Sequence, residues 1–240
     1  MILCTGGNGL LAKTLSNLDE DIISLSKEEL DVRDMASVRE VLDEYKPDIV
    51  IHAGAVTEGS KIEKNFLDRL QAIHVNIIGT SNVVMACMIR QIRLCYISSD
   101  YIYGNSNKGV PAYRHNENDP ILPQNKYSWS KLGGECACQL YNKSLIIRTS
   151  FLSDLFQYDK IFDNCYTSKD RVSIIAPMIL KAAKSDVTGI LNIGTNRKSF
   201  ECFAKEGAEI VNKELFNSYD FPEEMVLDTF KYQSLIGGVN

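Results

Sequence analysis

The chain lacks the features that direct a protein to nucleic acid or into a membrane. Its 240 residues include no long run of lysine and arginine, and 31 acidic against 26 basic side chains give a formal net charge of −5. Proteins that bind a phosphate backbone usually concentrate positive charge on one face. No uninterrupted apolar run reaches membrane-spanning length. We therefore expect neither a nucleic-acid partner nor a membrane.

Signals for export and for metal binding are scarce as well. The first residues, MILCTGGNGLL, lack the basic start and the cleavage site of a signal peptide. The seven cysteines are an odd number, which is typical of reduced thiols in the cytosol. Cys136 and Cys138 are two residues apart in an expected helix, so they do not share a face. These patterns predict a cytoplasmic protein without a metal site.

Short apolar runs alternate with longer helix-like segments over the first 150 residues, without internal repeats or flexible linkers. The apolar runs are residues 1–5, 21–26, 48–55, 92–99 and 144–150, and helical spacing covers 10–18, 34–45, 65–88 and 127–141. Strands separated by helices indicate β-α-β units and a parallel sheet. Continuous apolar runs favour a sheet that is covered on both faces. The sequence thus predicts an α/β fold, a Rossmann-type doubly wound parallel sheet.

The remainder of the chain is less regular. Residues 173–184 have the spacing of a helix that is interrupted or started at Pro177, residues 199–211 that of another helix, and residues 189–193 that of a strand. We predict that residues 1–150 form a nucleotide-binding Rossmann domain and that residues 151–240 are mostly a small substrate-binding cap. Within this second part, residues 189–200 are expected to return to the Rossmann sheet.

A glycine-rich turn, TGGNGLLA, connects the first expected strand to the first expected helix. Gly6, Gly7 and Gly9 allow the backbone to turn tightly and to approach a pyrophosphate, which the amides at the helix start can hold. Ala12 stands where a third glycine is usual, and alanine is small enough for close packing. Such a turn can also be only a turn. Its place at the start of an alternating pattern favours dinucleotide binding.

The end of the second expected strand bears on the choice of dinucleotide. A carboxylate that binds a ribose diol is common at this point, but this chain has Ser26 and Lys27. A hydroxyl and an ammonium suit a 2′-phosphate better than a free diol. The pair therefore favours NADP(H) over NAD(H), although Lys27 could also be an ordinary solvated lysine.

Three further residues form a candidate catalytic set. Tyr127 and Lys131 are four residues apart at the start of an expected helix, so they share a face. A tyrosine hydroxyl has a pKa near 10, and we expect the nearby ammonium to lower it toward the working range. Ser99 ends the fourth expected strand, at the sheet edge where ligands bind in this class of fold. It can donate a hydrogen bond to a carbonyl oxygen beside the tyrosine.

These motifs resemble those of the extended short-chain dehydrogenase/reductase family, and most of all its dTDP-4-dehydrorhamnose reductase branch. The matching segments are TGGNGLLA (5–12), LDVRD (30–34), PDIVIHAGAVT (47–57), HVNIIGTSNV (74–83), ISSDYIYG (97–104) and PQNKYSWSKLGGE (123–135). The resemblance is strong over residues 1–150 and weak through 189–200. Residues 151–188 depart most from the family pattern, in the segment that lines the sugar pocket in relatives.

The resemblance implies roles for individual residues. Ser99, Tyr127 and Lys131 would be catalytic, and Lys131 would also bind the nicotinamide ribose. The cofactor-binding residues it implies are Gly6, Gly7, Asn8, Gly9, Leu10, Leu11, Ser26, Lys27, Asp31, Val32, Ala53, Gly54, Ala55, Thr57, Asn76, Tyr127 and Lys131. The substrate-binding residues it implies are Thr57, Asp100, Tyr101 and Trp129.

The implied reaction is NADPH-dependent reduction of the 4-keto group of a UDP- or dTDP-linked 4-keto-6-deoxyhexose. One alternative is an epimerase or 4,6-dehydratase that retains NAD, although Asp100–Tyr101 differs from the Asp-Glu pair usual in dehydratases. A second alternative is a non-catalytic regulatory subunit that binds NADP and a partner enzyme. The long helical segments 65–88 and 125–141 could bury apolar faces in a homodimer, or they could simply cover the sheet.

Overall fold

A six-stranded parallel sheet forms the centre of the protein. The structure is a computed structural model that describes residues 1–104, 106, 110, 112–162, 165–211 and 224–237. The sheet strands are β1 (Ile2–Thr5), β2 (Ile22–Leu25), β3 (Ile49–His52), β4 (Arg93–Ile97), β5 (Ser144–Arg148) and β10 (Gly189–Asn192). They are all parallel, in the order β10-β5-β4-β3-β1-β2. The predicted α/β doubly wound fold is confirmed.

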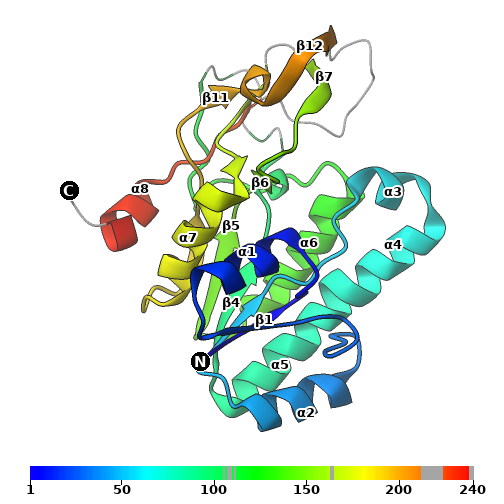
Figure 1. Cartoon of the computed structure of the whole chain (residues 1–240), viewed down its shortest axis with the longest axis vertical. Helices are drawn as coiled ribbons and strands as arrows, with labels where there is room; N and C mark the ends of the chain where they lie inside the picture. The colour runs from blue at the N-terminus through cyan, green and yellow to red at the C-terminus, as the bar shows by residue number, and fades with distance from the viewer. Residues whose placement is uncertain (105, 107–109, 111, 163–164, 212–223, 238–240) are drawn as a thin grey trace.

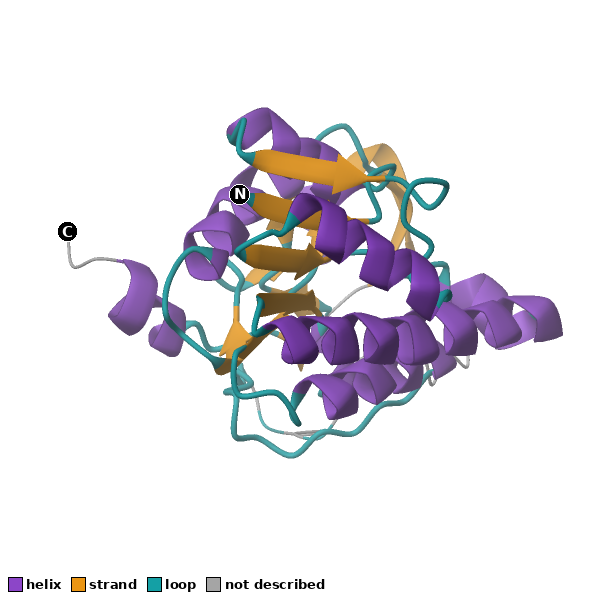
Figure 2. Cartoon of the chain, turned by 90° about the horizontal axis from the view of Figure 1, so that it is seen from below, coloured by secondary structure: helices purple, strands orange, loops and turns teal. Residues whose placement is uncertain are grey.

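Helices cover both faces of this sheet (Figure 2). On one face lie α1 (Leu10–Leu18) and α7 (Val172–Ala183), and on the other α2 (Met35–Tyr45), α5 (Thr80–Arg90) and α6 (Lys126–Cys138). The strands are apolar on both sides: Cys4 and Ile51 belong to the first core cluster, while Leu3 and Val50 belong to the second. Burying each such side chain contributes about 2 kcal/mol. Continuous apolar strands therefore make a two-sided sheet stable.

The order in which strands are added to the sheet reverses at β1, and a ligand is expected at such a reversal. From β1 the sheet continues to β2 on one side and to β3 on the other, so the strand order reverses between β1 and β3. In sheets of this kind the loops diverge at the reversal and leave a crevice beyond the carboxyl ends of the strands. The glycine turn follows β1, so the topology itself places it at this crevice.

The expected helix at 65–88 is built from three consecutive pieces. These are α4 (Phe66–Ala72), a π-helical segment η1 (Ile73–Gly79) and α5. By length and composition alone, Phe66–Arg90 is apolar enough to cross a membrane, so the expectation of no such run is wrong by this measure. Half of its most apolar window is buried inside the fold, because α5 packs against α2 and α6.

Small sheets form a cap at one end of the molecule, remote from α2 (Figure 1). β7 (Tyr158–Phe162) pairs with β12 (Ala204–Val211), and β6 (Phe151–Leu152) pairs with β9 (Asp170–Arg171). β8 (Tyr166–Thr167) lies between β11 (Lys198–Ser199) and β13 (Glu224–Met225). The other short elements are α3 (Gly59–Lys64), η2 (Asp100–Ile102), η3 (Phe200–Phe203), α8 (Phe230–Tyr232) and η5 (Gln233–Gly237).

One expected helix is wrong. Residues 199–211 form the short 3₁₀ turn η3 and then strand β12. Gly207 has φ +76°, which a right-handed helix does not contain. β12 gains backbone hydrogen bonds by pairing with β7, a partner far away in sequence that local spacing does not reveal. The other expected helix, α7, runs from Val172 through Pro177 without a break.

The domain division stays a prediction, and the structure suggests where to refine it. β10 pairs with β5 inside the large sheet. α7 lies in the part expected to be cap, yet its buried side chains pack in the core of the sheet with α1. We propose that the nucleotide-binding unit includes α7 and β10, and that the cap consists of the small sheets alone.

Candidate active site

A cavity of about 540 Å³ opens at the carboxyl ends of the sheet strands. It collects residues from the glycine turn, from the segments after β2, β3, β4 and β5, and from the start of α6. The lining residues are Gly6, Asn8, Gly9, Leu10, Leu11, Ala12, Lys27, Ala53, Gly54, Ala55, Thr57, Ile97, Ser98, Ser99, Tyr101, Tyr127, Lys131, Thr149, Ser150 and Phe151. All three predicted catalytic residues are among them.

The glycine turn forms one wall of the cavity from backbone. Gly6 has φ +75°, and a Cβ on it would lie 2.7 Å from the Cα of Gly54. No larger residue fits between the ends of β1 and β3. Helix α1 follows at Leu10, and Gly9 at its N-cap supplies no side-chain hydrogen bond. The first amides of α1 are therefore left for other acceptors, as a phosphate-binding turn requires.

A buried hydrogen-bond chain fixes the two sides of this wall. The Thr5 hydroxyl oxygen lies 2.7 Å from Nδ1 of His52 and accepts a bond from the Gly54 amide at 3.1 Å. On the other side of the ring, Nε2 of His52 lies 3.0 Å from the Thr80 hydroxyl. Burial lowers the pKa of His52 to about 3, so the ring is neutral at physiological pH. His52 holds the turn in place.

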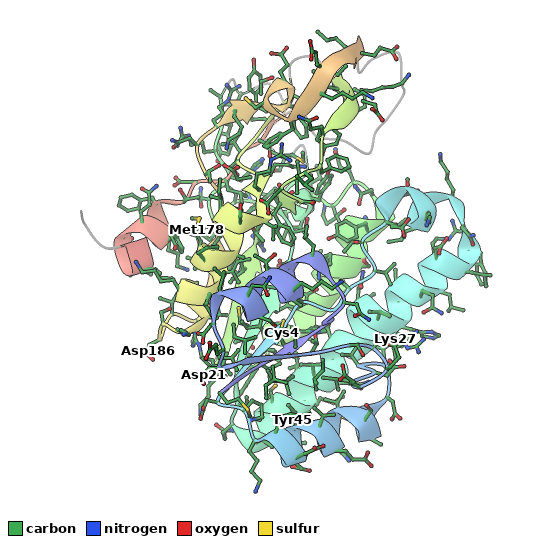
Figure 3. The ribbon with its side chains drawn as sticks, viewed as in Figure 1. Cys4, Asp21, Lys27, Tyr45, Met178 and Asp186 are labelled. Atoms are coloured by element: carbon green, nitrogen blue, oxygen red, sulfur yellow. The ribbon has the colours of Figure 1, made fainter. Side chains whose placement is uncertain are left out.

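Several predicted cofactor residues lie outside the cavity lining. Gly7 packs against the backbone of Leu25, and Val32 is buried in the core. The amide of Ser26 donates to Glu29. The carboxylate of Asp31 is held by Arg33, with Nε to Oδ1 at 2.9 Å. Contacts of these residues with a cofactor stay predictions. After β2, Lys27 lines the cavity; its side chain is labelled in Figure 3.

Asn76 is fully buried, and it shapes the cavity without lining it. Its side chain accepts a hydrogen bond from the Val56 amide at 2.8 Å and donates to the Val56 carbonyl at 2.9 Å. It also donates to the Ser130 hydroxyl at 2.8 Å. Val56 lies between two lining residues, so Asn76 ties the loop after β3 to helix α6.

Local interactions set where α6 begins. The Asn125 side chain accepts a hydrogen bond from the Ser128 amide at 2.8 Å, and the Ser128 hydroxyl accepts one from the Asn125 amide at 3.3 Å. This reciprocal capping box starts the helix at Lys126. Tyr127 consequently sits in the first turn with Lys131 one turn later on the same face.

Helix α6 lies close against β4. A Cβ on Gly134 would come within 2.4 Å of the hydroxyl oxygen of Tyr96. The Tyr96 hydroxyl donates to the backbone carbonyl of Lys131 at 3.1 Å, and the Lys131 ammonium lies 4.3 Å from the centre of its ring. Glycine at 134 permits this approach, which brings Lys131 to the edge of the sheet beside Ser99.

A buried ion pair anchors the same helix to β5. Arg148 donates to Glu135 through Nη2 at 2.9 Å and through Nε at 3.2 Å, and both side chains are buried. The Arg148 guanidinium also lies 4.8 Å from the centre of the Tyr103 ring. Breaking one partner of such a pair costs several kcal/mol. The pair holds α6 in a fixed position against the sheet.

The three predicted catalytic groups meet at the end of β4. Ser99 is buried, and its hydroxyl oxygen accepts a hydrogen bond from the Tyr101 amide at 3.2 Å. The same hydroxyl is within hydrogen-bonding reach of Tyr127. Lys131 is 3% exposed and lines the cavity with them. Burial lowers the pKa of Lys131 to about 8, so its ammonium still carries a proton at pH 7.

The expected lowering of the tyrosine pKa is wrong for this structure. Burial raises the pKa of Tyr127 to about 12, the charge of Asp100 adds to this rise, and the hydrogen bond with Ser99 opposes it. The loss of hydration outweighs the favourable hydrogen bond because a phenolate is costly in a buried site. Tyr127 is therefore a protonated phenol at neutral pH, a state suited to donating a proton.

Asp100 is a buried acid directly behind Ser99. It is 2% exposed, its Oδ1 accepts a hydrogen bond from the Ser99 hydroxyl at 3.3 Å, and its Oδ2 has no partner among the described residues. Burial raises its pKa to about 6, and the charge of Lys169 opposes this rise. Lys169 is itself buried in the cap, with its ammonium 4.8 Å from the centre of the Phe200 ring.

The predicted substrate residues divide into two groups. Thr57 and Tyr101 line the cavity, and the Tyr101 ring meets the Tyr127 ring edge-on with centroids 6.4 Å apart. Trp129 is 57% exposed and does not line the cavity, because it points away from the face of α6 that carries Tyr127 and Lys131. Asp100 is 2% exposed and does not line the cavity, although it accepts a hydrogen bond from Ser99, which does.

Sequence reasoning missed part of the wall. Ser98 and the segment Thr149–Phe151 line the cavity but were not among the predicted site residues. A usable signal was present, because both follow adjacent parallel strands and ligands bind beyond the carboxyl ends of such strands. Lys169 carried no such signal, since its approach to Asp100 depends on how the cap folds. Among the described residues, no group of three or more His, Cys, Asp or Glu side chains could hold a metal ion.

Comparison with known families decides the relationship. The family described as RmlD substrate binding domain matches residues 1–176. The chain belongs to this family. The resemblance inferred from the sequence motifs is confirmed.

Individual relatives of this RmlD-family chain agree with that assignment. It is 34% identical over 156 residues to the spore coat polysaccharide biosynthesis protein SpsK of Bacillus subtilis, covering 63% of this chain and 53% of the relative. It is 30% identical over 156 residues to the dTDP-4-dehydrorhamnose reductase of Aggregatibacter actinomycetemcomitans, covering 62% and 51%. The matched stretch thus spans about half the length of these relatives.

Solved structures extend the likeness to the whole RmlD-family chain. The dTDP-4-dehydrorhamnose reductase of Bacillus anthracis, solved in complex with NADP, superimposes with a TM-score of 0.85 at 26% identity. That comparison covers 100% of this chain and 93% of the other. A reductase of the same name from Clostridium acetobutylicum has a TM-score of 0.84 at 24% identity, covering 99% and 92%. The second comparison supports the fold alone.

Proposed function

We propose that this RmlD-family chain catalyses NADPH-dependent reduction of the 4-keto group of a nucleotide-linked 4-keto-6-deoxyhexose, a step of deoxysugar biosynthesis. The observation that carries the proposal is the meeting of Ser99, Tyr127 and Lys131 in one cavity with the glycine turn. A hydride carrier bound at the turn would reach the same space as an acid and a hydrogen-bond donor. The names of the relatives supply the substrate class.

The chemistry assigns one task to each side chain. Ser99 donates a hydrogen bond to the keto oxygen and holds it beside the phenol. Tyr127, a protonated phenol at neutral pH, donates its proton to that oxygen as the carbonyl carbon accepts hydride. Lys131 stabilises the phenolate left behind, which then regains a proton from solvent. Preorganised donors of this kind act where charge develops and typically contribute several kcal/mol each.

The cavity residues fit NADP(H), which supplies the hydride when bound. The backbone wall at Gly6 and the open amides of α1 suit a pyrophosphate. Lys27 lines the cavity after β2, where an ammonium suits a 2′-phosphate. We assign cofactor binding to these groups together with Asn8, Ala53 and Ala55 on the same wall.

The sugar is assigned to the side of the cavity that faces Tyr101 and Thr57, with the nucleotide being UDP or dTDP. Asp100 would reach the sugar hydroxyls only if its surroundings moved, since it is buried and does not line the cavity. Trp129 is not included in the substrate site because of its exposure outside the cavity.

The direct test is incubation of the purified protein with NADPH and a panel of UDP- and dTDP-4-keto-6-deoxyhexoses, following loss of nicotinamide absorbance. We expect turnover with at least one member of the panel and a reduced sugar as product. Protein that retains NAD through purification and catalyses epimerisation or dehydration would contradict the proposal. A stoichiometric partner enzyme combined with no turnover on any keto-sugar would contradict it as well, and would favour a regulatory subunit.

We further propose that two copies associate through the apolar surface of α4 and α5, in the cytoplasm and without nucleic acid or membrane. Phe66 and Leu67 are 66% and 65% exposed, and Ile89 is 66% exposed on the same helical stretch. Large apolar side chains that are exposed to solvent commonly lie in an interface. Sedimentation velocity tests the proposal, because Phe66→Asp with Ile89→Asp should shift a dimer to a monomer.

A further inference from the structure

Two buried hydroxyls on the cavity wall have no hydrogen-bond partner. Ser98 is 4% exposed and Thr149 is 3% exposed, and neither hydroxyl oxygen is bonded within the described part of the chain. Both residues line the cavity. Leaving a buried hydroxyl without a partner costs about 1–3 kcal/mol. A fold that keeps two of them at one place gains nothing from them for its own stability.

Backbone hydrogen bonds set these two residues side by side. Ser98 follows β4 and Thr149 follows β5, which are neighbouring parallel strands. The Ser98 amide donates to the carbonyl of Ile147 at 2.7 Å, and the Asp100 amide donates to the carbonyl of Thr149 at 3.3 Å. The ladder thus continues past the strand ends and makes the two hydroxyls part of a rigid wall.

The positions of Ser98 and Thr149 in the cavity indicate which part of a bound ligand they would face. Ser98 precedes the catalytic Ser99, so the pair lies at the catalytic end and away from Lys27 at the end of β2. Each hydroxyl can donate one hydrogen bond and accept another. A primary amide, with one carbonyl oxygen and one NH₂ group, complements two such hydroxyls in both directions.

We propose that Ser98 and Thr149 bind the carboxamide of the nicotinamide ring and thereby fix which face of the ring is turned toward Tyr127. The proposal rests on the proposed use of NADP(H). One hydroxyl donates to the carboxamide oxygen and the other accepts from its NH₂ group. In the free protein the two unpartnered hydroxyls lower the stability of the fold. In the complex each of them gains a hydrogen bond to the ring, and this gain strengthens cofactor binding.

A third buried hydroxyl provides a matched comparison. Ser144 is 3% exposed, its hydroxyl has no partner among the described residues, and it lies on β5, the strand that Thr149 follows. However, it begins the strand, at the opposite edge of the sheet from the cavity. Removing it repeats the chemical change in the same strand without touching the proposed site.

The test compares two ligands that differ only in the nicotinamide base. Calorimetric titration gives the Kd of NADPH and of 2′-phospho-ADP-ribose, which keeps both riboses and the pyrophosphate. In Ser98→Ala with Thr149→Val we expect the Kd of NADPH to rise about tenfold, the loss of two modest hydrogen bonds. The Kd of 2′-phospho-ADP-ribose should stay within a factor of about two.

Three controls make the result specific. Ser144→Ala should change neither Kd. Thr149→Ser keeps the hydroxyl and should retain most of the NADPH affinity. Thermal melting of the ligand-free Thr149→Val protein should show equal or higher stability, because the substitution removes an unpartnered polar atom from a buried position. The single variants carry the measurement if the double variant does not fold.

Each remaining outcome overturns the inference. Equal weakening of both ligands would show general damage to the cavity, and no change in either would show that the hydroxyls face only water. Wild-type protein that binds both ligands equally well would show that the nicotinamide is not held at all. In those three cases NADPH still binds and the proposed function stands. Only wild-type protein that binds neither ligand would remove both.

Discussion

The cavity has two walls built on different principles. The wall at the glycine turn is backbone, fitted so closely that a Cβ on Gly6 would come within 2.7 Å of Gly54. The opposite wall, at the ends of β4 and β5 and the start of α6, is made of side chains. Ser98, Ser99, Lys131 and Thr149 are there, and all four are buried polar groups.

The contrast shows what each wall can do. A backbone wall offers amides of fixed position and binds a group that every dinucleotide shares, such as a pyrophosphate. A wall of buried polar side chains is costly to keep, since each loses water and two of them, Ser98 and Thr149, lack a partner among the described residues. In the proposed reaction it faces the keto oxygen, on which charge develops. We therefore assign the pyrophosphate to the backbone wall, and the nicotinamide and the keto group to the polar wall.

Removing the Tyr127 hydroxyl distinguishes the contributions of the two walls most clearly. We expect Tyr127→Phe to lower kcat by about 10²- to 10⁴-fold, because a positioned general acid contributes that much. The Kd of NADPH should remain within about threefold, since the turn, Lys27 and the other groups assigned to cofactor binding are unchanged. Stopped-flow reduction and calorimetry measure the two. Tyr141→Phe, whose hydroxyl donates to the Ile92 carbonyl far from the cavity, is the control and should leave kcat unchanged.

The backbone wall should respond in the opposite manner. Gly6→Ala is expected to weaken NADPH binding at least tenfold and to lower the free energy of unfolding by about 1–3 kcal/mol. Gly189→Ala is the matched control, because Gly189 has φ +76° with nothing within 4 Å of a Cβ. It imposes the same backbone strain without the clash. Equal NADPH affinity in Gly6→Ala and wild type would refute a pyrophosphate site at the turn.

The pH dependence of stability tests how much it costs to bury the polar carboxyl of Asp100 next to this wall. Its pKa is raised by burial from 3.8 to about 6, so the folded state holds a proton that the unfolded state has lost between those values. The stability from this group is complete below pH 3.8 and declines as pH rises through about 6. Asp100→Asn should thus increase the free energy of unfolding at pH 7.5 by up to about 3 kcal/mol.

Denaturant titrations of this variant at pH 4 and pH 7.5 check the sign. The gain should disappear at pH 4, where the wild-type carboxyl is largely protonated in the folded state. Asp186→Asn, at an exposed loop position (Figure 3), should show no comparable gain at pH 7.5. A gain of equal size at both pH values would mean that burial of the charge is not the cause.

A substitution of Lys27 tests whether the preference for NADPH over NADH arises at the end of β2, beside the backbone wall. Lys27→Gln should weaken NADPH about tenfold relative to wild type and leave NADH affinity unchanged, since only NADPH carries the 2′-phosphate. Calorimetric titration with both cofactors gives the ratio. Parallel loss of both affinities, or loss of neither, would place the 2′-phosphate elsewhere.

The smallest effect is expected at Trp129. Its exposure of 57% and its position outside the cavity predict that Trp129→Ala changes kcat/KM by less than about twofold. The rate assay with the substrate identified from the keto-sugar panel measures it. A loss of tenfold or more would show that the site closes over Trp129 during the reaction.

Local sequence patterns predicted most of the sheet and the catalytic set. Every strand of the large sheet was expected, because each is a short, continuously apolar run next to a turn or a helix. Tyr127 and Lys131 were predicted from a four-residue spacing, since helix geometry alone puts them on one face. The helix expected at 199–211 was wrong because β12 is stabilised by β7, and spacing within one segment contains no information about a distant partner.

The pKa values and hydrogen-bond partners of individual side chains could not be predicted from the sequence. The pKa of Tyr127 rises because water is excluded from it, and exclusion depends on segments far apart in the chain that pack around the phenol. The same holds for the unpartnered hydroxyls of Ser98 and Thr149, which are visible only when every neighbour has been placed.

By itself the sequence determined the order of strands and helices, the glycine turn and the residues that share a helix face, because these follow from short-range geometry and from the burial of apolar runs. Tertiary structure alone decided which polar groups lose their water, which find a partner and which are left to a ligand. Solvation and hydrogen bonding depend on the whole three-dimensional surroundings of an atom, and no local pattern of residues contains them.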